Sequence, residues 1–429
     1  IDFILSTAYE ILAMNQEITG AEIVLQSLVD QGVEVVFGYP GGAVLPIYDT
    51  LFKQNSIKHV LVRQEGGAIH AAEGYARSTG KVGVVLVTSG PGATNVVTGL
   101  TDAMMDSIPV VCITGQVPQH LIGSDAFQEC DTTGITRPCT KHNYLVKDPN
   151  KLSPVFHEAF TIAQDGRPGP VLIDIPKDVQ FAKGSYTQKE KIIIPNHRLF
   201  EPEIFKNDEK INEVVNLIVK AKKPIFYIGG GCINSGPKAS ELVSQFVEIT
   251  GAPATMTLMG LGVLGSSHAQ SLGMLGMHGM YEANMAMHEC DVMINIGARF
   301  DDRVTGRLDA FSPNSKKIHI DIDESNINKT IKVDVPLVGD VKNVLNNIIK
   351  TWKDKKLKTN QNDLNLWWSK INSWKEIDCL HFKNNQKEIK PQYAIQRLYE
   401  LTKNKKTFIT TEVGQHQMWA AQFYKFEKP

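Results

Sequence analysis

One acidic residue stands in a setting that suits proton chemistry. Glu65 lies within Arg63-Gln-Glu-Gly-Gly-Ala-Ile-His-Ala-Ala-Glu-Gly-Tyr-Ala-Arg77, after a short apolar segment and before glycines and alanines. Small neighbours allow close packing, and a carboxyl group packed away from water has a raised pKa, which suits general acid–base catalysis. The alternative is a helix that begins at this point, with Glu65 at the positive end of its dipole.

Glycine-rich turns are the second feature that could bind a ligand. They occupy residues 38–42, 89–92 and 229–231. Glycine after a strand lets the backbone approach a phosphate, but it also simply makes a tight turn. Several such turns in two successive α/β units favour nucleotide-like ligands. None has the full G-x-G-x-x-G pattern with an acid at the expected offset, which disfavours a nicotinamide dehydrogenase.

The residues from Thr19 to about Gln180 alternate between strand-like and helix-like patterns. The β-branched run from Val82 to Val87 is typical of a strand buried on both faces of a parallel sheet. Repetition of strand, glycine turn and helix predicts a doubly wound α/β domain with ligands at the carboxyl ends of its strands. We predict strands at 33–37, 58–63, 82–87, 110–114 and 171–175, and helices at 21–31 and 68–77.

A polar stretch from Phe181 to about Pro202 predicts a linker, and a second α/β unit follows it. Residues 341–390, rich in Lys, Asn and Trp, indicate a helix and a charged connector. A helix at 392–401 and a strand at 407–411 would begin another α/β domain. The strands predicted for the second unit are 224–228, 291–296 and 318–322.

The string around Glu65 resembles the pyrimidine-binding domain of the acetohydroxyacid (acetolactate) synthase family of thiamine-diphosphate enzymes. The resemblance runs from about Thr19 to the last residue. Four further strings carry it: Phe37-Gly-Tyr-Pro-Gly-Gly-Ala43, Thr88-Ser-Gly-Pro-Gly-Ala-Thr-Asn95, Gly123-Ser-Asp-Ala-Phe-Gln-Glu129 and Gly166-Arg-Pro-Gly-Pro-Val-Leu-Ile-Asp-Ile-Pro-Lys-Asp178.

The resemblance implies successive doubly wound parallel-sheet domains, with a central Rossmann-like FAD domain. The implied boundaries are a pyrimidine-binding domain at 15–180, a linker at 181–205, the FAD domain at 206–345, a connector at 346–391, and an incomplete diphosphate-binding domain at 392–429. The family decarboxylates pyruvate on thiamine diphosphate and joins the hydroxyethyl fragment to a second pyruvate or to 2-oxobutyrate. This is the first common step of valine, leucine and isoleucine biosynthesis.

By the resemblance, Glu65 is the catalytic acid that hydrogen-bonds the pyrimidine ring of the cofactor. Gly42 and Gln128 lie near the reacting carbons, and a neutral amide such as that of Gln128 suits a developing oxyanion. Phe127 lies on the wall of the substrate channel and Lys177 at its entrance, although a phenylalanine read alone is more often a core residue. The residues implied to bind thiamine diphosphate are Glu65, Pro40, Asn95, Gly414, Gln415 and His416.

The middle domain resembles the family's flavin-binding segments, in which FAD takes no redox part. Arg303 is the residue implied to hold the second substrate's carboxylate, because a guanidinium matches a carboxylate bidentately. The alternative is that Arg299 and Arg303 form surface pairs with Asp301 and Asp302. The implied FAD residues are Arg167, Gly230, Gly231, Thr257, Leu258, Leu275, Gly276, Met277, His278, Gly297, Arg299, Asp301, Asp321, Ile322 and Asp340.

The family's Mg²⁺ is held by a Gly-Asp-Gly motif and a later asparagine in the third domain. No Gly-Asp-Gly occurs here, so we predict no metal ligand in this chain. His70, His278 and His416 show no partner at ligand spacing and are expected to be hydrogen-bonding or packing residues. We expect a C-terminally truncated chain that is inactive alone, with a true start at Met14.

The bulk composition excludes several classes of function. A formal net charge of −1 gives no reason to expect nucleic acid or an anionic membrane as a partner, and six scattered cysteines indicate a reducing compartment. The resemblance implies a homodimer or homotetramer with the active site between subunits, sometimes with a small regulatory subunit, in a plastid stroma or a bacterial cytoplasm. A pyruvate oxidase, another FAD-containing decarboxylase and a non-catalytic paralogue are the alternatives.

Overall fold

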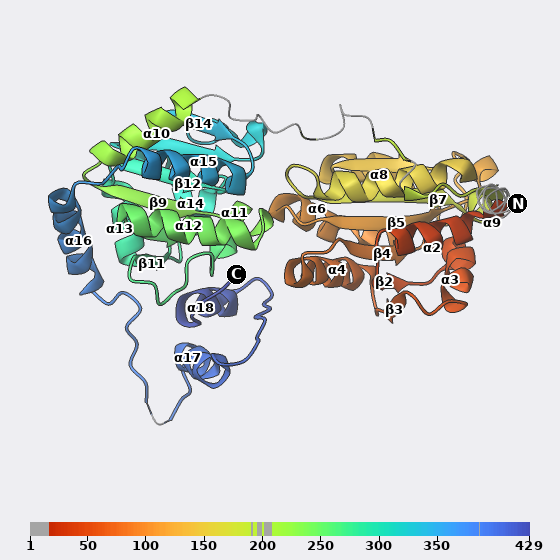
Figure 1. The fold of residues 1–429 in the computed structure, drawn as a ribbon. Helices are drawn as coiled ribbons and strands as arrows, with labels where there is room; N and C mark the ends of the chain where they lie inside the picture. Colours follow the sequence, from red (N-terminus) through yellow and green to blue (C-terminus); the bar gives the residue numbers. More distant parts are fainter. Residues whose placement is uncertain (1–16, 190–191, 195–199, 201–207, 386) are drawn as a thin grey trace, which may run out of the picture. The chain divides into compact units, whose positions relative to one another are not determined.

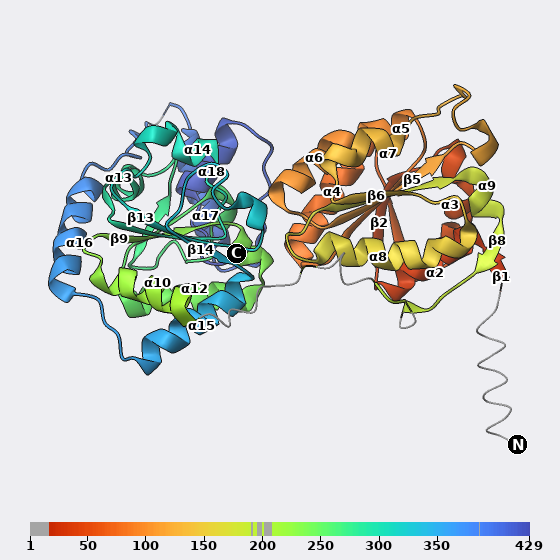
Figure 2. The same cartoon turned by 90° about the horizontal axis from the view of Figure 1, so that it is seen from above.

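The computed structural model describes residues 17–189, 192–194, 200, 208–385 and 387–429. The chain divides into two compact units, Ile1–Phe200 and Glu201–Pro429, which are drawn in Figures 1 and 2. Met14 and part of the predicted linker lie outside the described residues. No helix in the described part of the chain combines the length and the apolar character needed to cross a membrane.

The first unit is built on a parallel sheet of six strands in the order β3-β2-β4-β5-β7-β6. A short antiparallel pair, β1 with β8, lies beside it. The strands are β1 (Glu17–Thr19), β2 (Val35–Tyr39), β3 (Lys58–Leu61), β4 (Gly83–Val87), β5 (Val110–Gln116), β6 (His142–Leu145), β7 (Pro170–Pro176) and β8 (Lys183–Ser185). The helices are α2 (Gly20–Asp30), α3 (Leu45–Phe52), α4 (Glu65–Thr79), α5 (Pro91–Asn95), α6 (Val97–Asp106), α7 (Thr132–Thr136), α8 (Leu152–Gln164) and α9 (Lys177–Phe181).

Helices cover both faces of this sheet, and β4 shows why its sequence is apolar throughout. Val84 and Leu86 face the core that α2, α3 and α8 close, whereas Val85 and Val87 face the core closed by α4 and α6. Alternate side chains of a strand point to opposite faces, so a doubly covered strand must be apolar at every position. The predicted doubly wound architecture is therefore confirmed.

The second unit repeats this plan with a parallel sheet in the order β11-β10-β9-β12-β13-β14. Its strands are β9 (Pro224–Ile228), β10 (Ala254–Met256), β11 (Ser271–Met274), β12 (Val292–Ile296), β13 (Lys316–Asp321) and β14 (Val335–Val338). Its helices are α10 (Asp208–Lys220), α11 (Gly231–Asn234), α12 (Pro237–Thr250), α13 (Tyr281–Glu289), α14 (Asp302–Thr305), α15 (Val341–Asp354), α16 (Gln361–Lys375), α17 (Pro391–Thr402) and α18 (Gln415–Phe423).

Two helices from the lysine-rich region close opposite faces of the second sheet. Trp352 of α15 is buried in one core, and Trp367 and Trp374 of α16 are buried in the other. The charged side chains thus form the outer faces of packed helices. The strand predicted at 407–411 is wrong: these residues form no regular element. A lone segment has no neighbouring strand to receive its hydrogen bonds, and Phe408 remains 59% exposed.

Candidate active site

The order of strands in the first unit places a topological switch point beside Glu65. From β2 the chain passes outward to β3 and then returns to β4 on the other side of β2. The loops that follow β2 and β4 therefore lead away from each other at the carboxyl edge of the sheet. Open α/β sheets bind ligands at such a topological switch point.

Thr88, the residue after β4, holds the two loops together. Its Oγ1 accepts a hydrogen bond from the Ala43 N–H at 3.2 Å. A Cβ at Gly41 would lie 2.5 Å from the Thr88 Cβ, and a Cβ at Gly92 would lie 2.7 Å from its Cγ2. A side chain at either position would collide with Thr88, so both positions require glycine. The sequence placed Thr88 in a family string but assigned it no role, because only the fold brings residues 41, 43 and 92 to it.

Glu65 is the first residue of α4, and its carboxylate faces the loop after β4. The Asn95 amide donates a hydrogen bond of 2.9 Å to Glu65 Oε2. Among the described residues, Oε1 makes no hydrogen bond; a Cβ at Gly92 would lie 3.6 Å from it. Glu65 is half-buried. Glu65 therefore lies at a helix N-terminus, as the alternative interpretation expects, and it also has the hydrogen-bond partner and the free carboxylate oxygen that proton chemistry can use.

The loop after β5 brings Gln128 to the turn after β4, where it contacts Gly90. Gln128 has a φ of 60°. A Cβ at Gly90 would lie 2.6 Å from the Gln128 carbonyl oxygen, so only glycine permits this contact. Phe127 is 87% exposed, which rules out the core position that a phenylalanine more often takes. The Glu129 carboxylate accepts hydrogen bonds from the N–H groups of Gly123 and Ala126 and folds the loop back on itself.

The remaining predicted residues of the first unit lie at strand ends. Pro40 and Gly42 are exposed in the loop after β2, and a Cβ at Gly42 would meet no atom within 4 Å. Gly42 therefore faces open space. Lys177 begins α9 directly after β7 and is half-buried. Arg167 lies in the connection between α8 and β7, before the strand, and contacts the end of α6: it donates to Ser107 Oγ at 2.8 Å and to the carbonyl of Met104 at 3.1 Å.

Asp174 supports the Gln128 loop from inside the sheet. It lies in the middle of β7 and accepts hydrogen bonds from Thr114 Oγ1 at 2.7 Å and from Gln116 Nε2 at 2.9 Å. The same Gln116 amide donates to the carbonyl of Cys130 at 2.7 Å, two residues after Gln128. Burial raises the pKa of Asp174 to about 7, although these two hydrogen bonds oppose the shift. In the sequence, Asp174 is visible as the single acid inside the apolar run Val171-Leu-Ile-Asp-Ile175, and this pattern could have indicated a buried carboxylate.

Asp174 predicts a pH dependence of stability. Its folded pKa lies above the unfolded value, so its contribution is fully present below about pH 4 and is lost as pH rises through 7. We expect the free energy of unfolding of wild type, relative to that of Asp174→Asn, to fall by about 2–3 kcal/mol between pH 5 and pH 8. Urea denaturation read through pulsed hydrogen exchange of β5 and β7 measures it. A pH-independent difference would contradict the prediction.

The second unit has a switch point of its own, between β9 and β12. A Cβ at Gly229 would lie 2.2 Å from the Gly297 carbonyl oxygen, and the Gly231 N–H donates to that oxygen at 3.0 Å. The turns after β9 and β12 therefore cross backbone to backbone. Most of the predicted FAD residues follow strands at this edge: Gly230 and Gly231 after β9, Thr257 and Leu258 after β10, Leu275, Gly276, Met277 and His278 after β11, Gly297 after β12, and Ile322 after β13.

Backbone contacts join two of these loops. Gly276 has a φ of 100°, and the Met277 N–H donates to the carbonyl of Arg303 at 2.8 Å. Met277 and His278 are exposed beside them. Arg303 is 68% exposed and lies 3.0 Å from Asp302, while Arg299 lies 4.0 Å from Asp301. In the single chain the arginines thus form the surface pairs of the alternative interpretation.

Two acidic residues predicted for FAD already have protein partners. Asp321, the last residue of β13, is buried and accepts a hydrogen bond from the Asp323 N–H at 2.8 Å. Asp340 caps the start of α15 and accepts from Ser235 Oγ at 2.6 Å. Each has an evident structural role. Such roles are compatible with ligand binding, because the residues lie at the ends of β13 and β14.

Gly414, Gln415 and His416 form the start of α18 in the second unit. The His416 side chain is half-exposed, 4.0 Å from Glu412.

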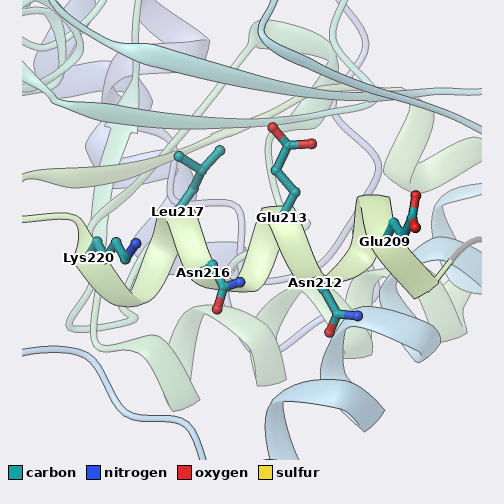
Figure 3. Close-up of a pocket in the computed structure, with 6 residues that line it drawn as sticks. All are labelled: Glu209, Asn212, Glu213, Asn216, Leu217 and Lys220. Atoms are coloured by element: carbon teal, nitrogen blue, oxygen red, sulfur yellow. The ribbon is translucent and has the colours of Figure 1, made fainter.

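A separate hollow of about 490 Å³ follows one side of α10, as Figure 3 shows. It contains none of the predicted site residues. Its lining comes from α10 alone: Glu209, Asn212, Glu213, Asn216, Leu217 and Lys220.

Comparison with known proteins gives two family matches and several close relatives. Residues 18–135 match the N-terminal TPP-binding domain of thiamine pyrophosphate enzymes, and residues 211–348 match their central domain. The acetolactate synthase large subunit of Buchnera aphidicola subsp. Schizaphis graminum is 50% identical over 96% of this chain and 71% of its own length. The Haemophilus influenzae large subunit is 49% identical over 96% and 71%. The Arabidopsis thaliana protein named acetolactate synthase, chloroplastic, is 47% identical over 97% and 61%.

These similarities extend over both described units, and the N-terminal match includes Glu65, Asn95 and Gln128. The chain belongs to the acetolactate synthase large-subunit family of thiamine pyrophosphate enzymes.

Proposed function

We propose that this chain is the catalytic part of an acetolactate synthase. It decarboxylates one pyruvate and joins the two-carbon fragment to a second pyruvate or to 2-oxobutyrate. The observation that carries the proposal is the Glu65 carboxylate, held by Asn95 beside a topological switch point of the sheet. The curated names of the relatives favour a synthase over the pyruvate oxidase alternative.

The residues of the first unit fit a thiamine pyrophosphate site. Thiamine diphosphate, when bound, supplies the electron sink that decarboxylation of a 2-oxo acid requires. Asn95 fixes Glu65 Oε2, so that Oε1 is left to exchange a proton with the cofactor's pyrimidine ring. Gly42 leaves room for the reacting carbons. Gln128 contributes a neutral amide to a developing oxyanion, and Asp174 with Gln116 holds its loop in place.

Substrate selection is assigned to the exposed residues around these loops. Phe127, at 87% exposure, has no packing role in its own unit and is free to form a channel wall. Lys177 lies at the end of β7 and supplies a positive charge there. Arg303 binds the carboxylate of the second substrate. Its present ion pair with Asp302 is solvent-exposed, and such pairs contribute little stability, so a substrate carboxylate can replace Asp302 at small cost.

The second unit fits a dinucleotide such as FAD, in a non-redox role. The turns at Gly229 and Gly297 cross at the switch point with no side chain between their backbones. The family resemblance implies that the flavin binds at this point. Arg167, Arg299, Asp301, Asp321 and Asp340 complete the proposed set. Within this chain we propose no Mg²⁺ ligand to the diphosphate, because its sequence contains no Gly-Asp-Gly motif. The proposed organisation has three domains: pyrimidine-binding, FAD-binding and diphosphate-binding.

The assembly and compartment follow the relatives. A homodimer or homotetramer, with Glu65 facing the diphosphate-binding domain of a second subunit, is proposed from the family resemblance. The name "large subunit" in two relatives supports a possible smaller regulatory subunit. A plastid stroma or a bacterial cytoplasm is proposed for the location, the former supported by the chloroplastic Arabidopsis relative.

Acetolactate formation tests the function. Pyruvate would be supplied with thiamine diphosphate, Mg²⁺ and FAD to the chain itself and to a chimera that adds the Buchnera diphosphate-binding segment after Pro429. We expect acetolactate from the chimera, with the flavin remaining oxidised. Reduction of the flavin by pyruvate without acetolactate would assign the chain to the oxidases. Absence of both products from a folded chimera that binds thiamine diphosphate would contradict catalysis.

A further inference from the structure

A cluster of metal-ligand side chains lies between α4 and α6, outside the residues assigned to the active site. The two helices pack closely, because a Cβ at Gly99 of α6 would lie 2.1 Å from Ile69 Cγ2 of α4. At this contact, His70 Nδ1 lies 2.9 Å from Glu73 Oε2 and 3.8 Å from Asp102 Oδ2. One ligand atom from each of the three side chains lies within 4.8 Å of the others.

Spacing along the chain explains why His70 and Glu73 lie together. His70 and Glu73 are three residues apart on α4, so they share one face of the helix. The sequence showed no partner at ligand spacing for His70; Glu73 is that partner, and the packing of α6 adds Asp102. Distances of 2.9 and 3.8 Å between ligand atoms suit a common ion, since Zn²⁺ takes N and O ligands at about 2.0–2.2 Å.

Glu73 supplies an independent indication of a ligand. Its side chain is only 7% exposed, and its Oε1 is buried without a hydrogen-bond partner. Two carboxylates and an imidazole thus meet, and one of these carboxylates carries a buried oxygen without a partner. Such groups are ordinarily paired or bound to a metal.

We propose that His70, Glu73 and Asp102 bind a divalent transition-metal ion of the Zn²⁺ type and that the ion clamps α4 to α6. One imidazole with two carboxylates favours Zn²⁺ over Mg²⁺ or Ca²⁺, which prefer all-oxygen sets. His70 and Asp102 are half-exposed, so water completes the coordination and the ion can enter from solvent. The clamp lies one to two turns beyond Glu65 and fixes the helix that presents it.

Zinc titration of the chain, prepared without an affinity tag, tests the proposal. Isothermal titration calorimetry should show one saturable site. His70→Ala, Glu73→Gln and Asp102→Asn should each weaken Zn²⁺ binding by about 10-fold or more. His381→Ala is the matched control, because His381 also has an acidic residue three positions away, Asp378 at 3.4 Å, but belongs to no three-ligand group among the described residues. Excess Mg²⁺ should not compete.

A second measurement does not depend on the variants folding. Crystals soaked in Zn²⁺ should give anomalous density between α4 and α6. Absence of that density, or a titration without a saturable site, would overturn the proposal. So would a site that the three variants leave unchanged.

Discussion

Glu65→Gln is expected to lower the rate of acetolactate formation by about 10²–10⁴-fold, the usual contribution of a positioned general acid–base. Glutamine preserves the size of the side chain, and its carbonyl oxygen can still accept the 2.9 Å hydrogen bond from Asn95. The proton that Oε1 would exchange is lost. Because the hydrogen bond with Asn95 remains, binding of thiamine diphosphate should change much less than the rate. Steady-state assay of acetolactate and titration of the cofactor separate the two quantities.

The matched control for this substitution is Glu34→Gln. Glu34 is an exposed acid of the same unit, and its carboxylate pairs with Lys81 at 2.6 Å. Loss of that surface pair should leave the rate near that of wild type. Equal activities of the two variants would remove Glu65 from the proton chemistry. Loss of activity in both would point to general damage to the unit.

Trp367→Ala is expected to destabilise the second unit by about 3–5 kcal/mol, the usual cost of removing a large buried aromatic side chain. Trp367 is 2% exposed, and its indole N–H donates to the carbonyl of Pro224, at the start of β9, at 3.1 Å. Its ring meets Trp374 edge-on at 5.8 Å. Truncation leaves both a cavity and an unpaired buried carbonyl. Urea denaturation followed by hydrogen exchange of β9 measures the loss.

Leu366→Ala is the matched control, since this neighbour on α16 is 73% exposed. It removes an apolar side chain of the same helix without opening a cavity. A loss in Trp367→Ala no greater than that in Leu366→Ala would show that α16 does not contribute to the core. Both views in Figures 1 and 2 place α16 at the outside of its unit, so its attachment depends on this inner face.

The parts of the fold that follow from hydrophobic periodicity could be predicted. The strand at 224–228 matches β9, and the apolar runs at 82–87 and 110–114 fall on β4 and β5. The edge strand β6 was missed because His142-Asn-Tyr-Leu145 is largely polar. The short strands β1 and β8 were missed because three residues are too few to show an alternation of apolar and polar side chains. β8 falls within the segment that the sequence assigns to a linker.

The site could be predicted only where one short string contains the relevant residues. Glu65 and its glycines are contiguous, so their character is visible in the sequence. The contacts of Thr88 with Gly41, of Gly90 with Gln128 and of Gln116 with Cys130 join segments that the chain order separates. The Phe127 position shows the reverse problem. Residue type predicts burial, whereas the 87% exposure is set by a loop held through Glu129.

The pairing of β1 with β8 has a consequence for how the first unit can be handled. Glu17 lies opposite Ser185, so the described start of the unit and its last strand are neighbours. A module whose two ends meet can be inserted, exchanged or circularly permuted through a short connection, without stretching its sheet. The first unit is therefore a transplantable piece, suited to being grafted intact between members of the family.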